Sequence, residues 1–284
     1  MSGPATPERS AEAQPSSATT RALESVDSGL TTLRARPVLA WSIPAGVFLV
    51  VLLIGVLDLP LYEWLIDEDG PIESAQLLLA LATAVLASVV AFQLWKLQWP
   101  RWLVFCWVVF AAGSFLLAGE EMSWGQRQLG FSGPDALTSA NFQNETNAHN
   151  LLTPWALSAT YTIVGVYGAG VGHAVWRRLP RVGEFADLLA PRWGSVSAPW
   201  FGVHAVVYAW YSVVEPILHT LGSDFSADDH LRKLGEPSEL VLGAGFLIFA
   251  IESLLIARLH PDAAASPAPA ERGDRLVDDD SGHG

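Results

Sequence analysis

Six long apolar segments constrain this chain of 284 residues more than any other feature. A helix needs about 20 apolar residues to cross a bilayer, and lipid offers the backbone no hydrogen-bond partners. Long apolar runs without strand alternation therefore indicate helices. The sequence predicts an all-α integral membrane bundle of six transmembrane helices, at residues 37–57, 74–95, 102–119, 151–176, 193–214 and 240–257.

The two ends of the chain differ in composition from the apolar segments. Residues 1–36 are rich in Ser, Ala, Thr, Pro and Glu, and residues 261–284 are rich in Ala and Pro before an acidic run. Such segments cannot bury enough apolar surface to offset the entropy lost on ordering. We expect two disordered cytoplasmic tails on either side of one transmembrane domain, residues 37–260.

The distribution of Lys and Arg predicts the orientation of the bundle. Of the 16 basic residues, all but three fall in the two tails and in the loops on the same side as the N-terminus, the exceptions being Arg127, Arg232 and Lys233. Cytoplasmic loops carry an excess of Lys and Arg. We therefore expect both termini to lie in the cytoplasm. The expected location of the protein is the cytoplasmic membrane of a bacterial cell.

With this orientation the whole net charge of −13 falls on the extracytoplasmic face. An acidic chain lacks the basic face that nucleic-acid binding needs, so the expected partner is membrane lipid and not nucleic acid. The single cysteine, Cys106, excludes an intramolecular disulfide and any site with several cysteine ligands.

The most informative polar stretch, residues 119–127 (GEEMSWGQR), lies where the third apolar segment ends. Two adjacent acids at that place are costly unless they are paired or functional. If the helix continues, Glu120, Ser123 or Trp124, and Arg127 share one face, and Arg127 can neutralise one of the two acids while the other stays available. Glu121 then points toward a neighbouring helix or a cavity.

A second stretch alternates polar side chains with a period of two. Its members are Asn141, Gln143, Glu145, Asn147 and His149. In an extended chain they lie on one face. Such a row can bind a polar headgroup, coordinate a metal or cover the helix ends.

A third set forms a stripe on the fifth predicted helix: His204, Tyr208, Tyr211, Glu215 and His219. The steps of three and four residues place all five on one helix face. Polar groups are expensive against lipid, so this face is expected to point into the bundle. The stripe is either a polar path or a hydrogen-bonded seam between helices.

Three further acids have structural interpretations. Glu73 and Glu239 each lie two residues after a proline, a pattern that favours capping of a helix start. Glu252 interrupts the sixth apolar segment and is expected to lie near the cytoplasmic interface, where it either extends toward water or pairs with a nearby arginine.

A resemblance rests on two motifs, GEE-x-SWGQR at 119–127 and N-x-Q-N-E-x-N-x-HN at 141–150, with EDGP-x-E at 68–73 as a third point of likeness. Together they resemble the signature of a family of uncharacterised bacterial multi-pass membrane proteins. The likeness takes in about half of the chain. It implies membership of a membrane-protein family and supplies no mechanism.

The leading functional hypothesis is a site for lipids or their headgroups at the extracytoplasmic boundary, where carboxylates and imidazoles have readily shifted proton affinities. The candidate catalytic residues are Glu120, Glu121, Glu145, His149, Glu215 and His219. The candidate substrate-binding residues are Gln126, Arg127, Asn141, Gln143, Asn147, His204, Tyr208 and Tyr211. The sequence assigns no metal ligand and identifies no cofactor.

Two alternatives stay open. A transporter would use the stripe on the fifth helix as a polar path, and a non-catalytic membrane component would use the polar cluster for assembly. A polar cavity open sideways to lipid favours the first hypothesis, whereas a continuous path between the two ends of the bundle favours transport.

Overall fold

The computed structural model describes residues 28–67, 69–130, 154–214 and 234–259, together with residues 25, 217 and 220. Within these residues every regular element is a helix, which confirms the predicted all-α class. Four spans are long and apolar enough to cross a membrane. They contain α2 (Pro37–Leu57), α4 (Pro71–Lys96), α5 (Arg101–Glu121) and α14 (Gly235–Leu259).

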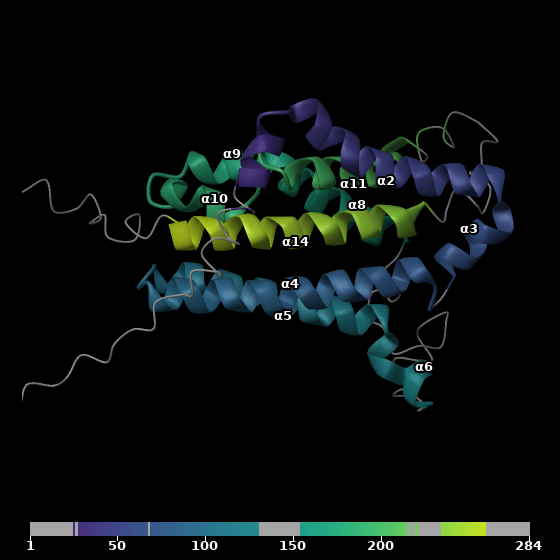
Figure 1. The fold of residues 1–284 in the computed structure, drawn as a ribbon, viewed down its shortest axis with the longest axis horizontal. Coiled ribbons are helices and arrows are strands. Elements are labelled where there is room, and N and C mark those ends of the chain that lie inside the picture. Colours follow the sequence, from purple (N-terminus) through teal and green to yellow (C-terminus); the bar gives the residue numbers. More distant parts are fainter. Residues whose placement is uncertain are drawn as a thin grey trace, which may run out of the picture.

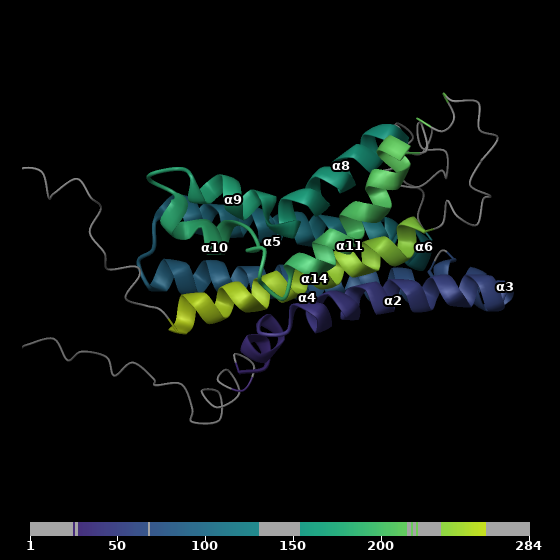
Figure 2. The ribbon, with the colours of Figure 1, turned by 90° about the horizontal axis from the view of Figure 1, so that it is seen from above.

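The long helices lie side by side along the long axis of the molecule (Figure 1). In the middle is α14, which packs against α4 on one side and against α11 (Ala198–Ala209) on the other. Helix α5 covers α4, and α8 (Pro154–Val166) covers α11. Figure 2 shows α2 along one edge of the bundle. Accordingly, 11% of the apolar window of α2 is buried, against 56% of that of α14.

The two ends of the bundle are named here by their short helices. The α3 end carries α3 (Leu59–Ile66), the start of α4 and α6 (Gln126–Leu129). The α10 end carries α9 (Gly172–Arg177), η4 (Gly183–Phe185) and α10 (Ala186–Leu189). Asp58 caps α3, because its Oδ1 accepts the backbone N–H of Leu61 at 3.1 Å. The apolar pattern of the sequence does not predict α3, η4 or α10.

The remaining two apolar segments form interrupted helices. Helix α8 passes through the wider π-helical turn η3 (Tyr167–Val171) into α9, and Gly170 has a φ of +116° inside that turn. Helix α11 continues into η5 (Trp210–Val214), also π-helical. Residues 193–197 were expected to be helical, but α11 starts only at Ala198, with Pro199 in its first turn. That expectation was wrong because Pro suits the start of a helix and the preceding chain forms a turn.

The packing places small side chains inside and large apolar ones outside. On α4 the buried positions include Ala80, Ala84 and Ala87. Leu78 and Val85 of the same helix are 66% and 65% exposed. Small residues let helices approach closely in lipid, and large apolar side chains face the acyl chains without penalty. This distribution fits a helix bundle whose outer surface meets lipid.

A close helix contact joins α8 and η3 to α11. A Cβ atom added at Gly165 would lie 2.8 Å from Cα of Ala205, and one added at Gly168 would lie 2.1 Å from the ring of Phe201. Neither glycine can carry a side chain without a shift of its neighbours. The glycines of the fourth apolar segment therefore allow two helices to touch, as their spacing indicates.

The boundaries of the tails differ in part from the prediction. Residues 28–34 are helical, although the sequence places them in a tail without regular structure. The physical reason is a long-range contact, since Arg34 pairs with Glu252 of α14. Residues 1–24 and 260–284, which make up most of the two predicted tails, lie outside the described residues.

Candidate functional site

Polar side chains from five helices meet at the α3 end of the bundle. They come from the starts of α4 and α14, the end of α5, and the halves of α8 and α11 that face them. Residues next to the start of α4 determine where this helix begins. Pro71 occupies its first turn, and the carboxylate of Glu73 accepts the backbone N–H of Asp69. The capping role predicted for Glu73 is thereby confirmed.

A small cavity, named here the carboxylate cavity, lies between these helices. Its polar lining consists of Gln76, Thr83, Ser114, Glu121, Tyr161 and Glu239, and its volume is about 20 Å³. A cavity of this size has room for about one water molecule. The carboxylate cavity is therefore too small for a lipid headgroup and matches a water molecule or a small ion.

Gln76 brings a carbonyl oxygen without a partner to the carboxylate cavity. The side chain is 4% exposed, and its Nε2 donates to the carbonyl oxygen of Glu236 at 2.8 Å. Its Oε1 has no hydrogen-bond partner among the described residues. A buried acceptor left unpaired costs about 1–3 kcal/mol. The geometry therefore leaves one oxygen ligand unused beside the two carboxylates.

Glu239 is held by two tyrosines. The hydroxyl of Tyr161 on α8 donates to Oε2 of Glu239 at 3.2 Å, and the hydroxyl of Tyr208 on α11 donates to Oε1. The rings of the two tyrosines lie 4.7 Å apart. The carboxylate is thus fixed between three helices. The capping role predicted for Glu239 is wrong, because both of its oxygens serve these tyrosine hydroxyls.

His204, one turn before Tyr208, is fully buried. Its Nδ1 lies 3.0 Å from the carbonyl oxygen and 2.9 Å from Oγ of Ser238. Its ring lies 4.8 Å from that of Tyr208. His204 and Tyr208 therefore form a hydrogen-bonded seam between α11 and α14. Of the other members of the stripe, Tyr211 has its backbone in η5, and its side chain, Glu215 and His219 lie outside the described residues.

The chain after α5 turns sharply instead of continuing as a helix. Helix α5 ends at Glu121, and Ser123, Trp124 and Gly125 have φ values of +45°, +57° and +79°. The expectation of one continuous helix to Arg127 was wrong, because three successive residues with positive φ interrupt the helix before α6 begins.

Trp124 folds back over the end of α5. A Cβ atom added at Gly119 would lie 2.8 Å from the Trp124 indole, and the indole Nε1 donates to Oε1 of Glu120 at 2.9 Å. The glycine, the first acid and the tryptophan of the GEE-x-SWG motif are thereby explained as one structural unit. Glu120 belongs to this unit, whereas Glu121 faces the carboxylate cavity.

The remaining predicted site residues fall into two groups. Gln126 begins α6. The backbone of Arg127 also belongs to α6, but its side chain is not among the parts of the chain that the structure describes. The row predicted to form one polar face lies wholly outside the described residues; its members are Asn141, Gln143, Glu145, Asn147 and His149.

Five polar residues of the carboxylate cavity were not predicted as site residues: Gln76, Thr83, Ser114, Tyr161 and Glu239. Glu239 and Gln76 share a signal, since each follows an acid by three residues at a helix start, in the pairs Glu236–Glu239 and Glu73–Gln76. Residues three apart share a helix face. Tyr161 has no comparable signal, because no acidic residue lies three or four positions from it in the sequence.

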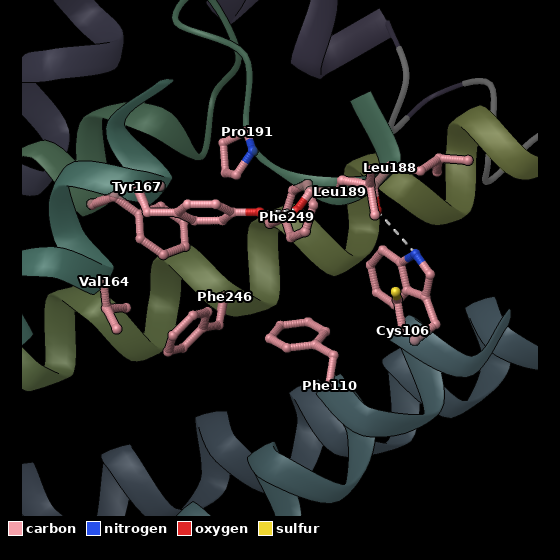
Figure 3. A pocket seen from close by; sticks show the side chains of 12 residues that line it. Cys106, Phe110, Val164, Tyr167, Leu188, Leu189, Pro191, Phe246 and Phe249 are labelled. Atoms are coloured by element: carbon pink, nitrogen blue, oxygen red, sulfur yellow. Dashed lines mark hydrogen bonds between the residues drawn. The ribbon is translucent and has the colours of Figure 1, made fainter. Parts of the chain in front are cut away.

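Two further cavities follow along α14 toward the α10 end. The aromatic cavity, of about 180 Å³, is lined by Phe110, Phe246 and Phe249 among others (Figure 3). The arginine cavity, of about 280 Å³, is lined by Arg34, Arg192 and Glu252 among others. Phe246 borders both the carboxylate and the aromatic cavity, and Phe249 borders both the aromatic and the arginine cavity. Aromatic side chains therefore interrupt the polar lining.

The described residues contain no group of three or more His, Cys, Asp or Glu side chains placed to hold a metal ion. The donor set of the carboxylate cavity consists instead of two carboxylates, one amide oxygen and hydroxyl groups. Comparison of the chain with family models, with curated proteins and with solved structures finds no match in any of the three.

Proposed function

We propose that this protein is a transporter-like membrane protein that takes up a small cation in the carboxylate cavity. In this proposal the six apolar segments cross the membrane with both termini in the cytoplasm, so that the α3 end is extracytoplasmic. The excess of Lys and Arg at the other end supports this orientation.

The observation that carries the proposal is that oxygen atoms line the carboxylate cavity, which has room for about one water molecule. Glu121, Glu239 and the unpartnered Oε1 of Gln76 converge there from three helices. Oxygen ligands of this kind suit hard cations, and acids inside a membrane bundle usually mark ion or proton sites. A cation in the cavity supplies the positive charge that offsets the two carboxylates.

Apolar side chains of α14 border the cavity beside its polar lining. Leu242 and Phe246 follow Glu239 by about one and two helical turns, and Thr83 and Ser114 lie about two turns from Gln76 and Glu121 on α4 and α5. A transport site needs a barrier on one side of the bound ion, and the phenyl ring of Phe246 supplies such a barrier. The two interrupted helices, one with η3 and the other with η5, resemble the broken helices that transporters use near their sites.

The test is a flux measurement with purified protein in sealed vesicles. A trapped pH dye reports proton uptake under an imposed gradient, and sodium uptake is followed in parallel. Glu121→Gln and Glu239→Gln are expected to abolish uptake of the transported cation. Glu63→Gln is the matched control, because Glu63 is an exposed acid of α3 outside the cavity. Equal uptake by all variants, or none by the unmodified protein, contradicts the proposal.

Processing of lipid headgroups is the second candidate. It is favoured by Glu120, a half-buried acid in the last turn of α5 whose carboxylate accepts the indole N–H of Trp124. The remaining catalytic candidates for this activity lie outside the described residues, apart from Glu121. Lipid analysis of cells that carry Glu120→Gln and His149→Ala tests this candidate, since an unchanged lipid profile in both variants removes it.

A further inference from the structure

The α10 end of the bundle holds a second site with a different chemistry. We propose that the arginine and aromatic cavities together bind one anionic phospholipid of the leaflet at the α10 end, its phosphate in the arginine cavity and an acyl chain in the aromatic cavity. This inference does not depend on the proposed cation site, which lies at the other end of α14.

The two cavities are neighbours. Pro191 and Phe249 line both of them, so only these two shared side chains stand between a headgroup in one cavity and a chain in the other. The arginine cavity has a volume of about 280 Å³ and the aromatic cavity one of about 180 Å³. A polar cavity beside an apolar one complements a molecule with a charged head and a hydrocarbon tail.

The charges of the arginine cavity leave one positive group without a partner. Arg34 pairs with Glu252 at 2.9 Å, and Asp187 lies 3.0 Å from Nε2 of His173. The guanidinium of Arg192 has no hydrogen bond or ion pair with any described residue, and its side chain is exposed. A phosphodiester carries one negative charge, and a guanidinium with the nearby Ser195 hydroxyl can bind its oxygens.

In this proposal the aromatic cavity lies at the depth of an acyl chain, and two residues of its lining are exposed at the surface of the bundle. Cys106 on its rim is exposed and follows the start of α5 at Arg101 by five residues. A rise of 1.5 Å per residue places it about 8 Å from that end of the helix. Tyr167, on the opposite rim, is 39% exposed (Figure 3). Trp193, next to Arg192, is 68% exposed, as befits an indole at a membrane interface.

The experiment counts bound phospholipid by native mass spectrometry of the purified full chain. The probes are phosphatidylglycerol, phosphatidylcholine and glycerol phosphate, which has a phosphate and no acyl chain. We expect one phosphatidylglycerol to bind most tightly and glycerol phosphate not to bind. Preference for phosphatidylglycerol follows from its net negative charge beside Arg192.

Two variants at exposed positions test the binding of the phosphate and the binding of the acyl chain separately. Arg192→Ala is expected to weaken phosphatidylglycerol binding about fivefold, since one basic side chain at a membrane surface contributes about 1 kcal/mol. Cys106→Trp is expected to reduce binding by filling the mouth of the aromatic cavity. Arg178→Ala is the matched control, because Arg178 is an exposed arginine at the same end that lines neither cavity.

Three results overturn the proposal. Equal losses in Arg192→Ala and Arg178→Ala mean a general surface attraction. Unchanged binding in Cys106→Trp means that no chain enters the aromatic cavity. Binding of glycerol phosphate as tight as that of the phospholipid means a phosphate site without a lipid. Failure of cation uptake leaves this proposal unaffected, because its readout is lipid binding alone.

Discussion

Arg34 Nη2 and Glu252 Oε1 lie 2.9 Å apart, although 218 positions separate them in the chain. The pair ties the segment before α2 to the last turns of α14. Glu252 is 2% exposed, and it also accepts the backbone N–H of Val196 at 3.0 Å and the hydroxyl of Ser197. One carboxylate therefore joins three parts of the chain at the α10 end.

Glu252→Gln is expected to destabilise the bundle by about 3 kcal/mol. The amide keeps the shape of the side chain but replaces one acceptor oxygen with a donor, which faces groups that also donate. The partly exposed position of Arg34 limits the loss, because water solvates the guanidinium once the pair is broken. Thermal unfolding in detergent measures the change.

The control for Glu252 is Glu184→Gln. Glu184 is an exposed acid of η4 at the same end of the bundle, and its replacement is expected to change stability by less than about 0.5 kcal/mol. If both variants melt at the temperature of the unmodified protein, the carboxylate of Glu252 does not hold the three segments together.

Gly168→Ala is expected to destabilise the contact between η3 and α11 by about 1–3 kcal/mol. The added methyl group would lie 2.1 Å from the ring of Phe201, which is itself buried. The ring has to move, and the helices have to separate. The measurement is again thermal unfolding in detergent.

Gly113→Ala is the matched substitution in an open position. No atom lies within 4 Å of a Cβ atom built at Gly113 on α5. Replacing a glycine inside a helix by alanine then stabilises the helix by about 0.5–1 kcal/mol. A loss of stability in Gly168→Ala and a gain in Gly113→Ala support close packing at Gly168. Equal changes of stability in the two variants contradict it.

The extent of the helices could be predicted from local sequence where apolar runs and helix starts coincide. Helix α2 spans Pro37–Leu57 as predicted, and α4 begins at Pro71, where a proline and an acid occupy the first turn. The signals are local because they depend on hydropathy and on the first turn of each helix. The π-helical turns at η3 and η5 escaped prediction, since they depend on packing between α8 and α11.

The carboxylate cavity was less predictable, because it depends on which helices are neighbours. Glu121 was singled out from the cost of acids in an apolar run. The other residues of the cavity on α4, α8 and α14, namely Gln76, Tyr161 and Glu239, could be identified only from the packing of these helices against each other. The pairing of Glu252 with an arginine was one of two outcomes expected from burial cost, but the identity of Arg34 follows only from the fold.

The orientation proposed for the bundle predicts which end of it can be labelled from outside the cell. In a Cys106→Ser background, Glu63→Cys and Arg181→Cys place single thiols at exposed positions of the α3 end and the α10 end. A maleimide that does not cross membranes is expected to label the first in intact cells and the second only after the membrane is opened. The reverse pattern contradicts cytoplasmic termini.

Tyr161→Phe and Tyr208→Phe are expected to destabilise the α3 end by about 1–2 kcal/mol each, because each removes a hydroxyl that donates to Glu239. Since both hydroxyls bind one carboxylate, the two losses are expected to differ from additivity by about 0.5 kcal/mol or more in the double variant. Tyr167→Phe is the control, because the Tyr167 hydroxyl donates to the carbonyl oxygen of Leu189 instead. Its loss is expected to add to that of Tyr161→Phe without coupling. Additive losses for both pairs, measured by thermal unfolding, contradict a shared carboxylate at Glu239.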